Sequence, residues 1–240
     1  MKFPCIALLA VGLLAGVMVK AQTADDIVNK HIEAIGGKDK ISSIKSIYME
    51  SDLEVMGNSA PSVTYILNGK GYRNDVDFNG QKITRVVTPT GGWAINPMAG
   101  QTAAEATPAE QLKSEVVEYQ VGGLLYDYAA KGNKIELQGK EDVNGVSAHK
   151  LKVTTKDGAE TIYYIDPTSY YVLKTVNKMS IQGQDIEAIR TFSKYTKTDF
   201  GYVIPYSIEL TLPQGFTLNI NAKKVEFNKD VDMKMFDMPK

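Results

Sequence analysis

Apolar and polar residues alternate with a period of two along most of this chain. The pattern is strictest near the end, where the apolar positions of one segment are all even-numbered: Ile204, Tyr206, Ile208 and Leu210. A period of two predicts a β-strand with one buried and one exposed face. The next segment repeats this pattern from Phe216, but its apolar positions change from even to odd after Ala222, which predicts a β-bulge near Lys223 and Lys224.

Turn-forming pairs interrupt the alternation at short intervals: Asn68-Gly69, Asn79-Gly80, Gly91-Gly92, Asn144-Gly145 and Asp157-Gly158. They divide the chain into about eleven or twelve strands that hairpins connect. A meander of this length with one apolar face has to curl. We therefore expect a mainly β protein with helices, built as an incomplete antiparallel β-barrel of about eleven strands.

Two stretches follow a helical period instead. The first runs from Ile27 to Ile35 after a capping residue at Thr23 or Asp25, and Gly36-Gly37 ends it. The second opens with a capping box in 107–110 and continues to Gly132, with a break at Gly122-Gly123. We expect this N-terminal helix and this inserted helical lid to cover the concave face of the sheet, since no other apolar surface is available to it.

An apolar concavity under a helical lid suits an acyl chain. The residues that we expect to line it come from the alternating strands, from the lone tryptophan and from the inserted helix. They are Tyr65, Trp93, Leu112, Val116, Ile204, Tyr206, Ile208 and Leu210.

The first residues carry an export signal. Lys2 precedes an uncharged run from Ile6 to Val19, and Val19-Lys20-Ala21 forms a site of the kind that signal peptidases cut. We expect residues 1–21 to be a signal peptide and residues 22–240 to be a single periplasmic domain. The only cysteine, Cys5, lies within the signal, so the mature chain has no disulfide, no thiol chemistry and no cysteine metal site.

Charge and reactive residues narrow the classes of function. The chain has 27 basic and 28 acidic residues. It therefore lacks the excess of positive charge that binding to nucleic acid or to an anionic membrane surface requires. Its two histidines, His31 and His149, have no neighbours at metal-ligand spacing, and we expect both to be surface or half-buried. No hydrolase, metalloprotease or phosphate-loop motif occurs. We therefore expect no catalytic residue, no metal and no cofactor.

Several short motifs, in order along nearly the whole mature chain, resemble one family. They are the opening helix with Ile35-Gly36-Gly37-Lys38-Asp39-Lys40-Ile41, then Gly71-Tyr72-Arg73, Gly92-Trp93 with Asn96-Pro97, the paired strands from Val146 to Asp166, and the ending Phe236-Asp237-Met238-Pro239. In these features the chain resembles the periplasmic outer-membrane lipoprotein-sorting carriers, the LolA/LolB-like superfamily, in the form common among Bacteroidota. The resemblance implies a half-barrel with a helical lid that carries lipoprotein acyl chains or another lipid across the periplasm, together with inner- or outer-membrane proteins that handle lipoproteins.

One departure from the family bears on its activity. Dedicated carriers have an Arg-Pro pair where this chain has Lys70-Gly71, and the resemblance ties that arginine to gating of the cavity. Two other functions therefore remain open. An envelope sensor or regulatory lipid-binding module would reuse the same half-barrel, although we expect no additional domain of the kind that such regulators carry. A secreted hydrolase is disfavoured by the shortage of nucleophile–base pairs.

The signal generates a direct prediction. We expect the mature protein to begin at Gln22 and to fractionate as a soluble periplasmic species, because no cysteine for lipid attachment follows the apolar run. N-terminal sequencing of the protein from its native cells checks this. Retention of Met1, or a membrane association that survives a salt wash, would contradict it.

Overall fold

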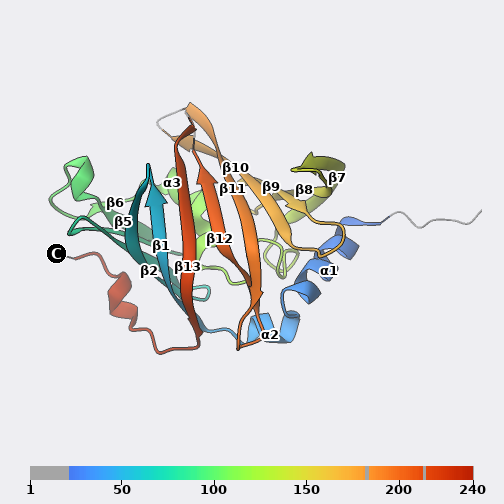
Figure 1. Ribbon diagram of the computed structural model, residues 1–240, viewed down its shortest axis with the longest axis horizontal. Helices are drawn as coiled ribbons and strands as arrows, with labels where there is room; N and C mark the ends of the chain where they lie inside the picture. Colours follow the sequence, from blue (N-terminus) through green and yellow to red (C-terminus); the bar gives the residue numbers. More distant parts are fainter. Residues whose placement is uncertain (1–21, 182–183, 213–214, 240) are drawn as a thin grey trace, which may run out of the picture.

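One antiparallel sheet makes up most of the structure (Figure 1), a computed structural model that describes residues 22–181, 184–212 and 215–239. Its thirteen strands are β1 (Ser46–Val55), β2 (Asn58–Leu67), β3 (Gly71–Phe78), β4 (Gln81–Thr88), β5 (Gly91–Ile95), β6 (Glu105–Ala106), β7 (Lys134–Val143), β8 (Val146–Thr154), β9 (Glu160–Ile165), β10 (Val172–Ile181), β11 (Gln184–Lys197), β12 (Val203–Thr211) and β13 (Thr217–Phe227). The helical elements are α1 (Ala24–Ala34), α2 (Lys38–Ser42), η1 (Pro97–Ala99), α3 (Ala109–Glu115), η2 (Val116–Tyr119) and η4 (Met233–Phe236). None of the helices in these residues is long and apolar enough to cross a membrane.

The sheet is open. Its strand order is β6-β5-β4-β3-β2-β1-β13-β12-β11-β10-β9-β8-β7, so the first strand pairs with the last one in the middle of the sheet. Strands β6 and β7 form the two edges, and within the described residues they are not paired with each other. The expectation of an incomplete antiparallel barrel is confirmed. The strand count exceeds the expected eleven partly because β6 has only two residues, too few to leave a pattern in the sequence.

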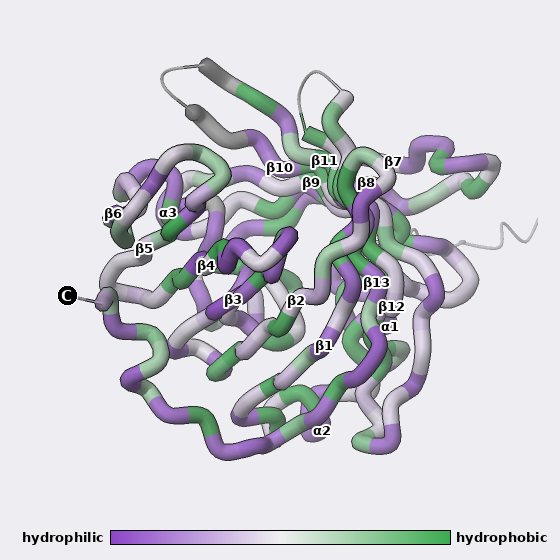
Figure 2. Tube along the Cα trace, turned by 60° about the vertical axis from the view of Figure 1, so that its left-hand side comes forward, coloured by the Kyte–Doolittle hydropathy of each residue, from purple (hydrophilic) through white to green (hydrophobic). Residues whose placement is uncertain are grey.

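The main core lies on the concave face. There α1, α2 and the turn after η2 contribute Ile27, Ile41 and Leu125, which pack with Leu151 and Ile165 of the sheet. Figure 2 shows hydrophobic stretches, in green, along β8, β9 and around α1. The capping of α1 is as expected, because Thr23 and Asp26 each accept a hydrogen bond from the other's backbone N–H.

The insert between β5 and β7 is less helical than the sequence predicts. The helix α3 spans only seven residues and lies behind the sheet in Figure 1, where it contacts β5 and β10. The expected capping box is wrong: Pro108 is the N-cap, and the Thr107 N–H is used to bond the carbonyl oxygen of Gly92 on β5. Gly122 and Gly123 both have left-handed backbone, at φ +79° and +65°, so the chain turns there instead of continuing a helix.

The register change in β13 is confirmed as a β-bulge. Glu50 pairs with Lys224 and the next residue, Ser51, pairs with Ala222, so Lys223 is the extra residue. The bulge keeps Ala222 and Val225 on the same side of the sheet. It explains why the apolar positions shift from even to odd without a change of face.

The C-terminal segment covers part of the convex face. Phe236 of η4 is buried against Val86 and Trp93, and the Trp93 indole nitrogen donates a hydrogen bond of 2.9 Å to the Phe236 carbonyl oxygen. Gly71 makes this docking possible, because a Cβ at that position would lie 2.8 Å from the Phe236 ring. The glycine of the Lys70-Gly71 pair is therefore required by packing.

This contact predicts a specific defect. Gly71→Ala should displace the Phe236 ring and destabilise the fold by about 1–3 kcal/mol, the usual cost of overpacking. The fluorescence of Trp93, the one tryptophan in the chain, should report the change as a red shift. Gly91→Ala is the matched control, since a Cβ there meets no atom within 4 Å. Equal stability and equal emission for both variants would contradict this account.

Candidate ligand-binding site

A cavity of about 260 Å³ lies on the concave face between the sheet and the insert. Four strands form most of its wall, α1 closes one side, and the segment from η2 to the following turn covers it. The lining residues are His31, Ile35, Val117, Glu118, Gly122, Gly123, Thr161, Tyr163, Val172, Thr175, Asn177, Arg190, Phe192, Tyr195, Tyr202, Val203, Ile204, Pro205 and Ile208. Most are aliphatic or aromatic, so the cavity offers an apolar ligand a place out of water.

Two of the residues expected from the sequence, Ile204 and Ile208, line this cavity. Leu210 lies on the same face of β12, opposite Arg190 and Leu218, but it is outside the lining. Tyr206 borders a separate hollow beside the turn between β11 and β12.

The two expected residues of the insert cover the concave side without reaching the cavity. Leu112 packs against Gly92 of β5. A Cβ on Gly92 would lie 2.7 Å from the Leu112 side chain. Val116 borders a different hollow, between the insert and residues 155–157. The insert therefore packs on the concave face as expected, but its contribution to the cavity comes from the next residues, beginning at Val117.

The structure corrects the placement of Tyr65 and Trp93, which lie on the convex face. Directly opposed residues of antiparallel strands share a face. Trp93 is opposite Val86, which is opposite Arg73, and Arg73 is opposite Tyr65. Their neighbours in sequence, such as Ile66, belong instead to the concave core.

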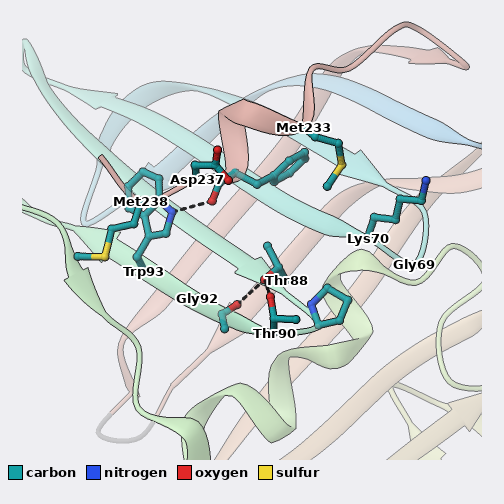
Figure 3. Close-up of a pocket in the computed structure, with 12 residues that line it drawn as sticks. Gly69, Lys70, Thr88, Thr90, Gly92, Trp93, Met233, Asp237 and Met238 are labelled. Atoms are coloured by element: carbon teal, nitrogen blue, oxygen red, sulfur yellow. Dashed lines mark hydrogen bonds between the residues drawn. The ribbon is translucent and has the colours of Figure 1, made fainter. Parts of the chain in front are cut away.

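Trp93 borders a second hollow, of about 480 Å³, beneath the C-terminal segment. Figure 3 shows its indole nitrogen directed at that segment, with Lys70, Met233 and Met238 around the rim. The sequence pattern failed here because the C-terminal segment gives the convex face an apolar cover of its own. Alternation cannot distinguish two faces when both are buried.

Ion pairs tether the insert above the cavity. Arg190 of β11 donates a hydrogen bond of 2.8 Å to Glu118 of η2, while Arg85 of β4 lies 3.1 Å from a carboxylate oxygen of Glu115 and 3.9 Å from Glu118. Strands β4 and β11 belong to opposite halves of the sheet. The pairs thus connect both halves of the sheet through the insert.

Burial and the neighbouring charges shift the pKa values of Arg85 and Tyr72 in this network. Burial by itself would lower the pKa of Arg85, but the Glu118 carboxylate, with Tyr72 and Glu115, raises it above its usual value. Burial, followed by the charge of Glu118, raises the pKa of Tyr72 to about 12. At neutral pH Arg85 is therefore charged and the Tyr72 phenol is neutral.

Two buried tyrosines hold the glycine turn of the insert. Tyr163 forms a hydrogen bond with the backbone of Leu124, and Tyr202 forms one with the backbone of Gly122. Burial raises the pKa of each phenol to about 12, so both are neutral at physiological pH. The abundance of tyrosine in the sequence thus has a structural cause at the cavity wall.

Both histidines are buried, so the expectation of surface or half-buried positions is wrong. His31 lies in the cavity wall with its Nδ1 2.8 Å from the Tyr170 carbonyl oxygen, and Tyr170 stacks on His149. A carbonyl oxygen only accepts, so Nδ1 carries the hydrogen and Nε2 remains an acceptor. Burial lowers the pKa of His31, and burial with the charges of Lys140 and Lys30 lowers that of His149.

Among the described residues no group of His, Cys, Asp and Glu side chains could hold a metal ion.

Sequence comparison finds no relative: no protein-family model and no curated protein sequence matches this chain. Solved structures do share its fold. A LolA superfamily protein from Nitrosomonas europaea is 11% identical and superposes with a TM-score of 0.59, over 90% of this chain and 97% of that one. A putative outer membrane lipoprotein-sorting protein domain from Vibrio parahaemolyticus is 14% identical, and a DUF1329 family protein from Desulfovibrio piger is 15% identical. Each has a TM-score of 0.57, over 88% of this chain and 95% of the other. The resemblance inferred from the sequence is thus confirmed in the fold.

The buried histidines predict a pH-dependent stability. Their pKa values are depressed in the folded state, so the unfolded chain takes up protons first as the pH falls below about 6.5. Stability should therefore be full above that pH and should decrease below it. Urea unfolding at pH 7.5 and 5.5 measures the loss, and His31→Gln should show a smaller loss than the wild type. An identical pH dependence in the two proteins would contradict the role assigned to His31.

Proposed function

We propose that this protein is a soluble periplasmic carrier, or a closely similar lipid-binding module, that takes the acyl chain of a lipoprotein or of another lipid into its concave cavity. The observation that carries the proposal is the cavity itself, an apolar space on the concave face whose cover is a separate segment of chain. The fold shared with a lipoprotein-sorting protein domain supports it. The mature domain would be residues 22–240, exported by the signal in 1–21.

The size of the cavity implies that its cover moves. At about 260 Å³ it is below the range of about 300–1,000 Å³ that is usual for small-molecule sites. Uptake of a long acyl chain therefore requires the insert to shift away from the sheet. The glycine turn at Gly122 and Gly123 gives the insert a point about which its backbone can change direction.

The energies favour such a movement when a chain binds. The side chains of Arg190 and Glu118 are 25% and 21% exposed, so their ion pair contributes no more than about 1 kcal/mol after screening by solvent. Each methylene that leaves water gains about 0.8 kcal/mol. Burial of a few methylenes thus offsets the loss of the pair between Arg190 and Glu118, whereas an empty protein has no such compensation and stays closed.

A cavity-filling substitution tests the location of the site. Ile208→Trp should fill the cavity and abolish binding of a fluorescent fatty-acyl probe, because no space is left for the chain. Leu210→Trp is the matched control, two residues further along the same face of β12 and outside the lining. Fluorescence titration measures binding, and thermal unfolding verifies that both variants fold. Unchanged probe binding by a folded Ile208→Trp protein would overturn the proposal.

The same titration separates the proposed carrier from a sensor. A carrier gives up its lipid to acceptor vesicles, whereas a sensor retains it and changes its affinity for a protein partner. Transfer of the probe to vesicles of phosphatidylethanolamine and phosphatidylglycerol would support the carrier. Stable retention together with a partner that binds only one of the two states would support the sensor.

A further inference from the structure

One end of the concave cavity contains a buried polar group without a partner. Asn177 of β10 lines the cavity and is only 6% exposed, and its side-chain Oδ1 makes no hydrogen bond to any described residue. Buried polar atoms in folded proteins nearly always have partners, and each exception calls for an explanation. A ligand that bonds this amide would supply one.

Other polar groups surround this amide on the same face of the sheet. Thr161 of β9 is directly opposite Asn177, and Thr175 lies two residues away on β10, opposite Arg190 of β11. All line the cavity, and both threonines are buried. Hydroxyl and amide groups donate as well as accept hydrogen bonds, so this end of the cavity matches a head group that can do both.

The opposite end of the cavity is mainly apolar, with His31 of α1, beside Tyr170, as a polar side chain in its wall. Val172 lies at the start of β10, and Tyr195 and Ile204 are close to it in the cavity wall. Five residues of a strand separate Val172 from Asn177, a distance of about 16 Å at about 3.3 Å per residue. The cavity therefore has a polar end and an apolar end, which is the shape of a molecule with a head and one tail.

The charges near the polar end cancel. Arg190 is paired with Glu118, and Arg85 with Glu115, so the cavity offers no free positive charge to a carboxylate or a phosphate. A charged head group buried there would lack a counter-ion, which is strongly unfavourable. An uncharged head group carries no such penalty.

We infer that the ligand is a single-chain lipid with an uncharged head group that both donates and accepts hydrogen bonds, such as the hydroxyls of a monoacylglycerol or the primary amide of a fatty amide. The head group lies against Asn177, Thr161 and Thr175, and the tail extends along β10 toward Val172. This inference rests on the proposed function, because it specifies the chemistry of the same cavity. A single chain requires the smallest movement of the cover, because the closed cavity has a volume of only about 260 Å³.

Competition among lipids with the same acyl chain tests the head group. The protein is loaded with the uncharged fluorophore phenylnaphthylamine and titrated with monopalmitoylglycerol, palmitamide, palmitate or methyl palmitate. Monopalmitoylglycerol and palmitamide should displace the fluorophore at concentrations about tenfold lower than the other two, since one well-formed hydrogen bond is worth about that factor. Palmitate is penalised by its charge, and methyl palmitate lacks a donor. Equal or tighter binding of palmitate would overturn the inference.

Variants locate the head group within the cavity. Asn177→Leu should weaken monopalmitoylglycerol about tenfold and leave methyl palmitate unchanged, because it removes the hydrogen bonds and keeps the side-chain size. Thr175→Val is a milder second variant, for use if Asn177→Leu does not fold. It should also weaken monopalmitoylglycerol relative to methyl palmitate. Thr191→Val, on the convex face of β11, is the control and should change nothing. Equal weakening of all four lipids, or of none, would contradict the assigned head-group site.

The failure of this inference and that of the proposed function are distinguishable. If none of the lipids displaces the fluorophore, the cavity is not a lipid site and both proposals are wrong. If all lipids displace it with equal affinity, the carrier proposal stands and only the head-group assignment is wrong.

Discussion

The structure depends on one constraint: an open sheet of thirteen strands has an apolar concave face, and no second sheet within the described residues covers it. The chain meets this constraint with segments from its own connections. The helix α1 lies against β7, its junction with α2 reaches the turn before β12, and the insert between β5 and β7 covers the middle. Where these covers meet over β9 to β12, they leave the cavity. The candidate site thus follows from incomplete coverage of one face.

The two covers are held in different ways, and the difference has functional consequences. The N-terminal helices pack through fully buried aliphatic residues such as Ile27 and Ile41. The insert packs through the buried residues Val121, Leu124 and Leu125 as well, and it adds polar contacts: the pairs of Arg85 and Arg190 with Glu115 and Glu118, and the hydrogen bonds between two tyrosines and the glycine turn. The pair of Arg190 with Glu118 is partly exposed and therefore weak in water, so this attachment of the insert breaks at low cost.

The sequence predicted the features that a two-residue alternation determines, which are the face of a strand and its register. Ile204 and Ile208 reach the cavity because alternation fixes the face of β12, and the bulge at Lys223 was visible as a shift in register. Tyr65 and Trp93 were misplaced because the convex face near β5 is also covered, by a segment more than a hundred residues away in the chain. Asn177 and the partners of Arg190 could not be found, since their significance comes from strand neighbours that only the folded topology brings together. Polar residues within an alternating strand otherwise indicate a solvent-exposed face.

The central claim is that the concave cavity carries one lipid molecule, and the contents of the protein in its native cells test it most directly. Native mass spectrometry of the protein, isolated from those cells without denaturant, measures the mass with and without extraction by organic solvent. We expect one bound single-chain lipid per protein molecule, which the solvent removes. A protein that is isolated without lipid, or that is instead tightly associated with a protein partner, would contradict it.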